Sequence, residues 1–149
     1  MAVLSFLGQA ILVTLGYGMA LLAAALFASI AIMNVGMAGF VGDWEQLLQT
    51  VLLFASTSLG AFPQTVAPAA LFVVLSELTR LRGFVVHLVA GCVIGLVAAL
   101  PVGTLMEGEV LPDLPGDVVR LAVASGAVGG FVYWLIAGRR AGRWLDTAA

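Results

Sequence analysis

Two ionisable side chains, Glu77 and His87, lie on either side of a short charged turn in the middle of the chain. His87 is the sole histidine. If each residue sits one helical turn from this loop, the two side chains reach a similar depth, and an imidazole beside a carboxylate can relay a proton. We favour a structural alternative, in which Glu77 pairs with Arg80 and the His87 ring packs above Gly91 or meets lipid headgroups.

A second candidate is the stretch from Pro63 to Pro68, where two prolines interrupt an apolar run. Each proline lacks a backbone N–H and clashes with the preceding turn, so we expect a kinked or broken helix. A broken helix at membrane depth exposes backbone carbonyls that can bind a solute, and Gln64 and Thr65 would line such a site or hinge. The alternative is a structural kink whose freed carbonyls are satisfied by neighbouring side chains.

The composition indicates a protein dissolved in lipid. The 149 residues are 62% hydrophobic and 9% charged, and the mean hydropathy is +1.16. A soluble domain carries about 25% charged residues to cover its surface. The net charge is −2, and no basic run provides a footprint for nucleic acid.

The residues required for most catalytic and metal sites are missing from the sequence. One histidine and one cysteine, Cys92, are too few for a zinc site or an internal disulfide. We find no nucleotide-binding loop and no set of residues resembling a hydrolase triad. We therefore expect a non-enzymatic protein with neither a metal nor a cofactor.

Four long apolar segments predict an all-α, polytopic membrane protein that forms a single domain over residues 1–149. The loops between them are short, so we expect two antiparallel hairpins. Gln9 and Thr14 of the first segment are polar and are expected to face Gln64 inside the bundle. The predicted spans cover residues 3–33, 46–76, 84–105 and 118–138.

Arginine positions set the predicted orientation. The turn after the second span holds two arginines and the C-terminal tail holds Arg139, Arg140 and Arg143, whereas the other two loops are acidic. Loops rich in basic residues stay in the cytoplasm. We expect a bacterial-type inner membrane protein with both termini cytoplasmic, whose C-terminal arginines contact lipid headgroups.

Small residues recur every four positions on the last two predicted spans. Gly91 and Gly95 form a GxxxG pair, and Ala122, Gly126 and Gly130 form a second stripe. Without bulky side chains, two such helices can approach closely. We predict that these five residues mediate helix packing.

These features support two hypotheses about function. The first is an accessory, assembly or scaffold protein that acts through helix–helix association with another membrane protein or with itself as a homo-oligomer. The alternative is an oligomeric transporter or channel for a small solute, built around Gln64 in the interrupted second span.

Overall fold

The protein is an all-α structure. The computed structural model describes residues 2–33, 44–100 and 114–142, and every regular element within these ranges is helical. This confirms the predicted fold class at the level of secondary structure. The helices are α1 (Ala2–Met33), α3 (Trp44–Leu78), α4 (Phe84–Ala98) and α6 (Gly116–Ile136), and a 3-10 turn, η1 (Gly138–Arg140), follows α6.

Three of these helices, α1, α3 and α6, are long and apolar enough to cross a membrane, whereas α4 is apolar but shorter. The 35 residues of α3 extend for about 52 Å, and the 15 residues of α4 for about 22 Å, against a hydrocarbon core of about 30 Å. The four helices lie where four segments were predicted, with ends differing by a few residues. The end predicted for the third span and most of both acidic loops lie outside the described residues.

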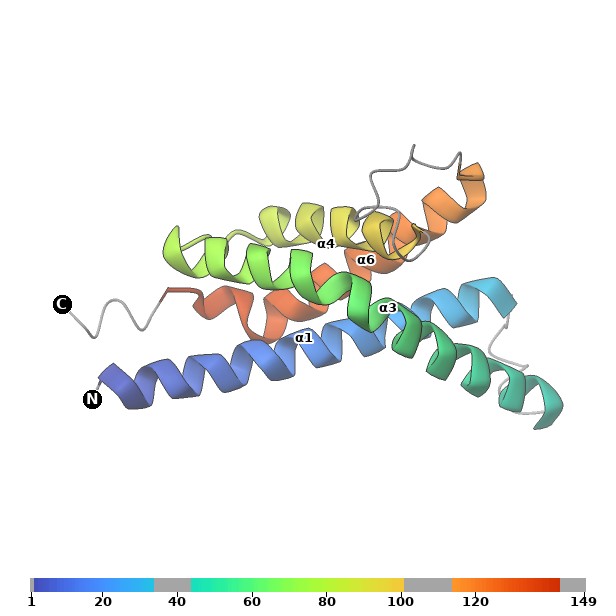
Figure 1. Ribbon diagram of the computed structural model, residues 1–149, viewed down its shortest axis with the longest axis horizontal. Helices are drawn as coiled ribbons and strands as arrows, with labels where there is room; N and C mark the ends of the chain where they lie inside the picture. The colour runs from blue at the N-terminus through green and yellow to red at the C-terminus, as the bar shows by residue number, and fades with distance from the viewer. Residues whose placement is uncertain (1, 34–43, 101–113, 143–149) are drawn as a thin grey trace.

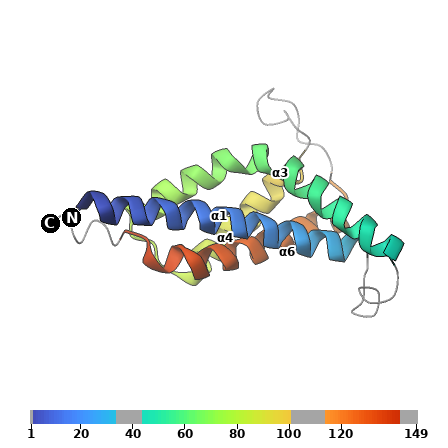
Figure 2. The same cartoon turned by 90° about the horizontal axis from the view of Figure 1, so that it is seen from below.

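Consecutive helices run in opposite directions, so the start of α1, the α3–α4 turn and the end of α6 lie at one end of the molecule (Figure 1). Helix α6 packs most extensively, against α4 on one side and α1 on the other. Helix α3 rests mainly on α1 and touches α4 less. Figure 2 shows the same arrangement from below.

The turn between α3 and α4 is set by local backbone geometry. The N–H of Leu81 donates to the carbonyl of Ser76 at 2.9 Å, and Arg80 adopts a positive φ of 55°. This is the Schellman arrangement, in which one left-handed residue ends a helix and reverses the chain. It returns the chain along α3 and places the start of α4 beside the end of α3.

Large apolar side chains face outward, and small ones fill the interior. Leu52 and Leu59 are 68% and 76% exposed, whereas Ala25 and Ala137 are almost fully buried. This is the reverse of a soluble protein and fits a surface covered by lipid.

Candidate functional site

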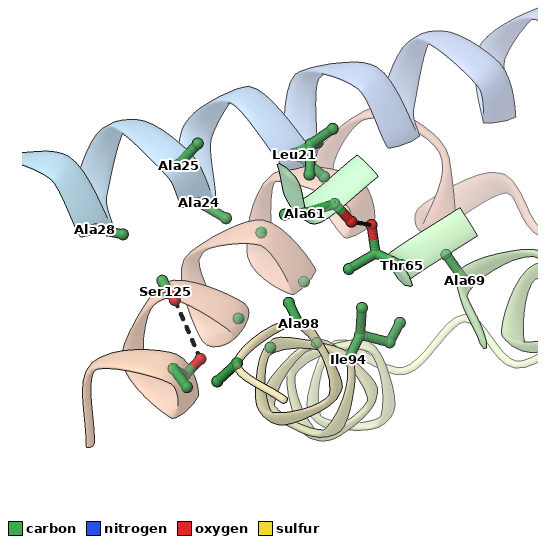
Figure 3. Close-up of a pocket in the computed structure, with 18 of the residues that line it drawn as sticks. Leu21, Ala24, Ala25, Ala28, Ala61, Thr65, Ala69, Ile94, Ala98 and Ser125 are labelled. Atoms are coloured by element: carbon green, nitrogen blue, oxygen red, sulfur yellow. Dashed lines mark hydrogen bonds between the residues drawn. The ribbon is translucent and has the colours of Figure 1, made fainter. Parts of the chain in front are cut away.

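A cavity of about 460 Å³ lies between the four helices, each of which contributes to its wall. Figure 3 shows alanines of α1, α3 and α4 and Ser125 of α6 around it. Most of the lining is alanine, glycine and aliphatic side chains, and no described lining residue is an acid, lysine or arginine. The volume is within the usual range of small-molecule sites, about 300–1,000 Å³. The cavity suits an apolar molecule.

One side of the cavity is fixed by a very close contact between α4 and α6. A Cβ added to Gly126 would lie 2.9 Å from the carbonyl carbon of Gly91 and closer still to its oxygen, and a Cβ on Gly95 would lie 2.9 Å from the Cα of Gly126. Real Cβ atoms essentially never approach other atoms this closely. Ala122 and Gly130 belong to the same contact. All five residues predicted to pack helices therefore lie in it.

Helix α6 packs against α1 through a different face. A Cβ on Gly129 would lie 3.2 Å from the carbonyl oxygen of Ala20, and a Cβ on Gly16 would lie 3.1 Å from the Cβ of Ala137. This contact is tight but looser than that with α4. Together the two contacts make α1, α6 and α4 a closely packed layer, on which α3 lies as the fourth wall of the cavity.

A small polar group lies on the α1 and α3 walls at the level of the prolines. Tyr17 Oη is 2.8 Å from Thr65 Oγ1, and Thr65 Oγ1 donates to the carbonyl of Ala61 at 2.8 Å. Sequence reasoning had identified Thr65 but missed Tyr17. The available signal was a tyrosine in the middle of a long apolar segment, since a hydroxyl in apolar surroundings needs a hydrogen-bond partner.

Gln64, the centre of the predicted polar or hinge site, has a structural contact. With its amide oriented so that the nitrogen faces α4, Nε2 donates to the carbonyls of Val97, at 3.2 Å, and Leu100, at 3.0 Å. The Val97 carbonyl also accepts from the N–H of Leu100 at 3.2 Å, and the two carbonyls lie at the end of α4 and just beyond it. Gln64 lines the cavity and also caps α4.

Pro63 and Pro68, the two ends of the same predicted site, both lie inside α3, which continues through them as one helix. The structure therefore does not show the second helix broken into two pieces. Pro68 removes the N–H that would otherwise bond to the carbonyl of Gln64 four residues earlier.

His87 is 1% exposed, and its ring is surrounded by other residues. It stacks on Tyr133 with ring centroids 5.7 Å apart and meets the edge of Phe72 at 5.2 Å. Its Nδ1 is 2.9 Å from the carbonyl of Gly83, whereas Nε2 has no hydrogen-bond partner among the described residues. A Cβ on Gly138 would lie 2.6 Å from Nε2, so this glycine is what the ring packs against.

Glu77, predicted to pair with His87, is held elsewhere. Its Oε1 accepts from Gln9 Nε2 at 2.6 Å, and its Oε2 accepts from the backbone N–H of Gly142 at 2.7 Å. Neither nitrogen of His87 is hydrogen-bonded to this carboxylate. The structure thus joins Gln9 to Glu77 rather than to Gln64, and Thr14 donates to the carbonyl of Ala10.

Further contacts close the same end of the bundle. Arg82 Nε donates to the carbonyl of Ala141 at 2.8 Å, and Trp134 Nε1 donates to the carbonyl of Arg82 at 3.0 Å. The guanidinium of Arg139 lies 5.9 Å from the centre of the Trp134 ring. These bonds tie the α3–α4 turn to the segment that follows α6.

Of the three arginines predicted to contact lipid headgroups, Arg139 and Arg140 are exposed on η1. Arg143 lies outside the described residues. Among the residues that the structure describes, no three His, Cys, Asp or Glu side chains are grouped so as to hold a metal ion.

Comparison of this chain with protein-family models, curated proteins and solved structures gave no match.

Proposed function

We propose that the protein is a non-enzymatic, four-span membrane protein of a bacterial-type inner membrane, built from two antiparallel hairpins with both termini in the cytoplasm. The support is three helices long enough to cross a membrane and the arginines at the end that holds the α3–α4 turn and η1 (Figure 1). A reporter fused after Ala149 should be active only as a cytoplasmic fusion, and activity as a periplasmic fusion would refute this orientation.

Within the bilayer, we propose that the bundle holds a small apolar molecule in its central cavity. The observation that carries this proposal is the cavity itself, about 460 Å³ with an almost wholly apolar wall. A carrier for ions or polar solutes usually places an ionisable group along its path. No acidic or basic side chain other than His87 is found among the described lining residues, so an apolar cargo fits better.

We propose that α3 is bent at Pro63 and Pro68 and serves as the wall that moves. Figure 2 supports this, because the ribbon of α3 changes direction along its length. Prolines inside a helix remove backbone bonds and favour a kink. Helix α3 also lacks the close glycine contacts that fix α4 to α6. A bend there would let α3 admit or release a molecule while the other three helices stay together.

Two matched substitutions on α3 test the cavity. Ala61 lines it, whereas Ala70 is exposed on the outer surface. Ala61→Leu adds three carbon atoms to the cavity wall and should abolish binding of a small apolar probe such as dodecanol, measured by native mass spectrometry of the protein released from detergent. Ala70→Leu adds the same atoms outside and should bind like the parent protein. Equal binding by both variants would refute the cavity as the site.

The second candidate, an accessory or scaffold role through helix–helix association, is favoured by a different observation. The outer face of α3 exposes Leu52, Leu59 and Leu71 to more than 60%, an area that a partner helix or a second copy would cover. The predicted small-residue stripes, by contrast, are occupied within the chain, in the α4–α6 contact. Cross-linking in native membranes through cysteines placed at Leu59 would trap the partner or homo-oligomer. Its failure at every exposed α3 position would remove this candidate.

A further inference from the structure

The hydroxyl groups of Tyr17 and Thr65 can be assigned donors and acceptors from their geometry. Thr65 Oγ1 lies 2.8 Å both from the carbonyl of Ala61 and from Tyr17 Oη. Each hydroxyl has one proton. A carbonyl can only accept, so both contacts become hydrogen bonds only if Thr65 donates to Ala61 and Tyr17 donates to Thr65. Both protons are then used, and only oxygen lone pairs remain available to a ligand.

Neighbouring polar groups of the cavity wall follow the same pattern. Ser125 donates its proton to the carbonyl of Ala122, and the amide N–H groups of Gln64 are directed to carbonyls of α4. The carbonyl of Gln64 has lost its helical donor, because Pro68 has no N–H.

Around Tyr17 and Thr65 the cavity therefore presents hydroxyl oxygens whose protons are already used. Thr57, another hydroxyl-bearing residue of the described lining, lies about two helical turns from Thr65. The ring of Tyr133 packs beside Gly16 and Ala20 of α1, and its hydroxyl interacts electrostatically with the Glu77 carboxylate.

We infer that the molecule held in the cavity is a neutral alcohol, an apolar body bearing a hydroxyl that donates to the oxygen atoms of Tyr17 and Thr65. This inference rests on the proposed function and specifies its ligand. An ether or ketone of the same length can only accept, so its oxygen would face lone pairs and lose the hydrogen bonds it makes in water. A charged head is disfavoured by the absence of a counter-charge in the described lining.

Native mass spectrometry with three probes tests this inference: dodecanol, its methyl ether and the methyl ketone of equal chain length. Dodecanol should bind about three- to tenfold more tightly than the other two, the effect of one net hydrogen bond. Equal binding of all three would overturn the inference and leave the proposed function standing. Failure of all three to bind would refute the proposed function itself.

Two conservative variants test which hydroxyl oxygen causes the preference for alcohol. In Thr65→Val the Tyr17 proton loses its acceptor and becomes free to donate, so the ratio of alcohol to ketone affinity should fall to one or below. In Tyr17→Phe the Thr65 oxygen still accepts and no donor is freed, so the preference for alcohol should persist. An unchanged ratio in Thr65→Val, with folding confirmed by retained dodecanol binding, would overturn the assignment. Loss of the preference in Tyr17→Phe would do the same.

Discussion

Replacing Gly126 by alanine tests the closest contact in the bundle. The added Cβ would lie 2.9 Å from the carbonyl carbon of Gly91, whereas ordinary contact begins at 3.4 Å. Backbone atoms cannot move aside as a flexible side chain can, so α4 and α6 must separate by at least about 0.5 Å. The separation also weakens the Cα–H···O contacts that such close helices make.

The expected change in the free energy of unfolding is the balance of opposing effects. Overpacking costs about 1–3 kcal/mol, and each weakened Cα–H···O contact costs about 0.5–1 kcal/mol. Alanine gains about 1 kcal/mol over glycine in helix propensity. We therefore expect Gly126→Ala to lower the free energy of unfolding by about 1–3 kcal/mol. Gly91→Ala strains the same contact, so the double variant should lose less than the sum of the two single losses.

Unfolding by sodium dodecyl sulfate in mixed micelles, followed by tryptophan fluorescence, measures these differences. Gly60→Ala is the matched control, because a Cβ there meets nothing within 4 Å, and it should be neutral or slightly stabilising. Gly129→Ala should fall between the two, since its Cβ would lie 3.2 Å from a backbone oxygen of α1. If Gly126→Ala were as stable as Gly60→Ala, the close approach of α4 and α6 would be wrong.

Three further predictions concern the ends of the helices. Gly138→Ala should destabilise the fold by about 1–3 kcal/mol, because its Cβ would meet the imidazole, and His87→Ala should relieve most of that loss in a double-mutant cycle; additive losses would argue against the contact. Glu77→Gln should speed hydrogen exchange of the Gly142 amide, whose acceptor is that carboxylate, and unchanged protection would contradict the bond. Gln64→Leu should speed exchange in the last turn of α4, which the Gln64 amide caps, while exchange at the start of α4 stays as in the parent.

The sequence was informative about helices because one solvent dictates their pattern. In lipid every backbone group needs an internal partner, so a long apolar run that enters a membrane is expected to be helical. The prolines were harder to interpret. A proline removes one helical hydrogen bond and its ring clashes with the carbonyl four residues earlier. Whether the helix continues depends on what satisfies the backbone carbonyls that lose their donors. Here α3 continues through Pro63 and Pro68, although these prolines leave the carbonyls of Leu59 and Gln64 without their helical N–H donors.

The partners of polar side chains could not be read from the sequence. Gln9 and Glu77 are 68 residues apart, and Gln9 was assigned to Gln64 only because both are amides in apolar segments. Periodicity indicates which face of a helix a residue occupies but not which helix covers that face. The glycines spaced four residues apart on α4 and α6 lie where these two helices meet, whereas the second contact of α6, with α1, depends on Gly129 and Ala20, whose pairing only the assembled fold shows.

The alanines that line the cavity raise the question of what occupies it. The space of about 460 Å³ is partly open to the outside rather than enclosed, so a molecule from the surroundings can enter it. Leucine at Ala61 or Ala98, both lining residues, would fill part of this space with no polar cost. The chain instead keeps alanine at both positions, which leaves room for another molecule. In a bilayer the competitor for that space is a lipid acyl chain, which carries no hydroxyl along its length. Selection of an alcohol over such a chain therefore depends on the lone pairs of Tyr17 and Thr65.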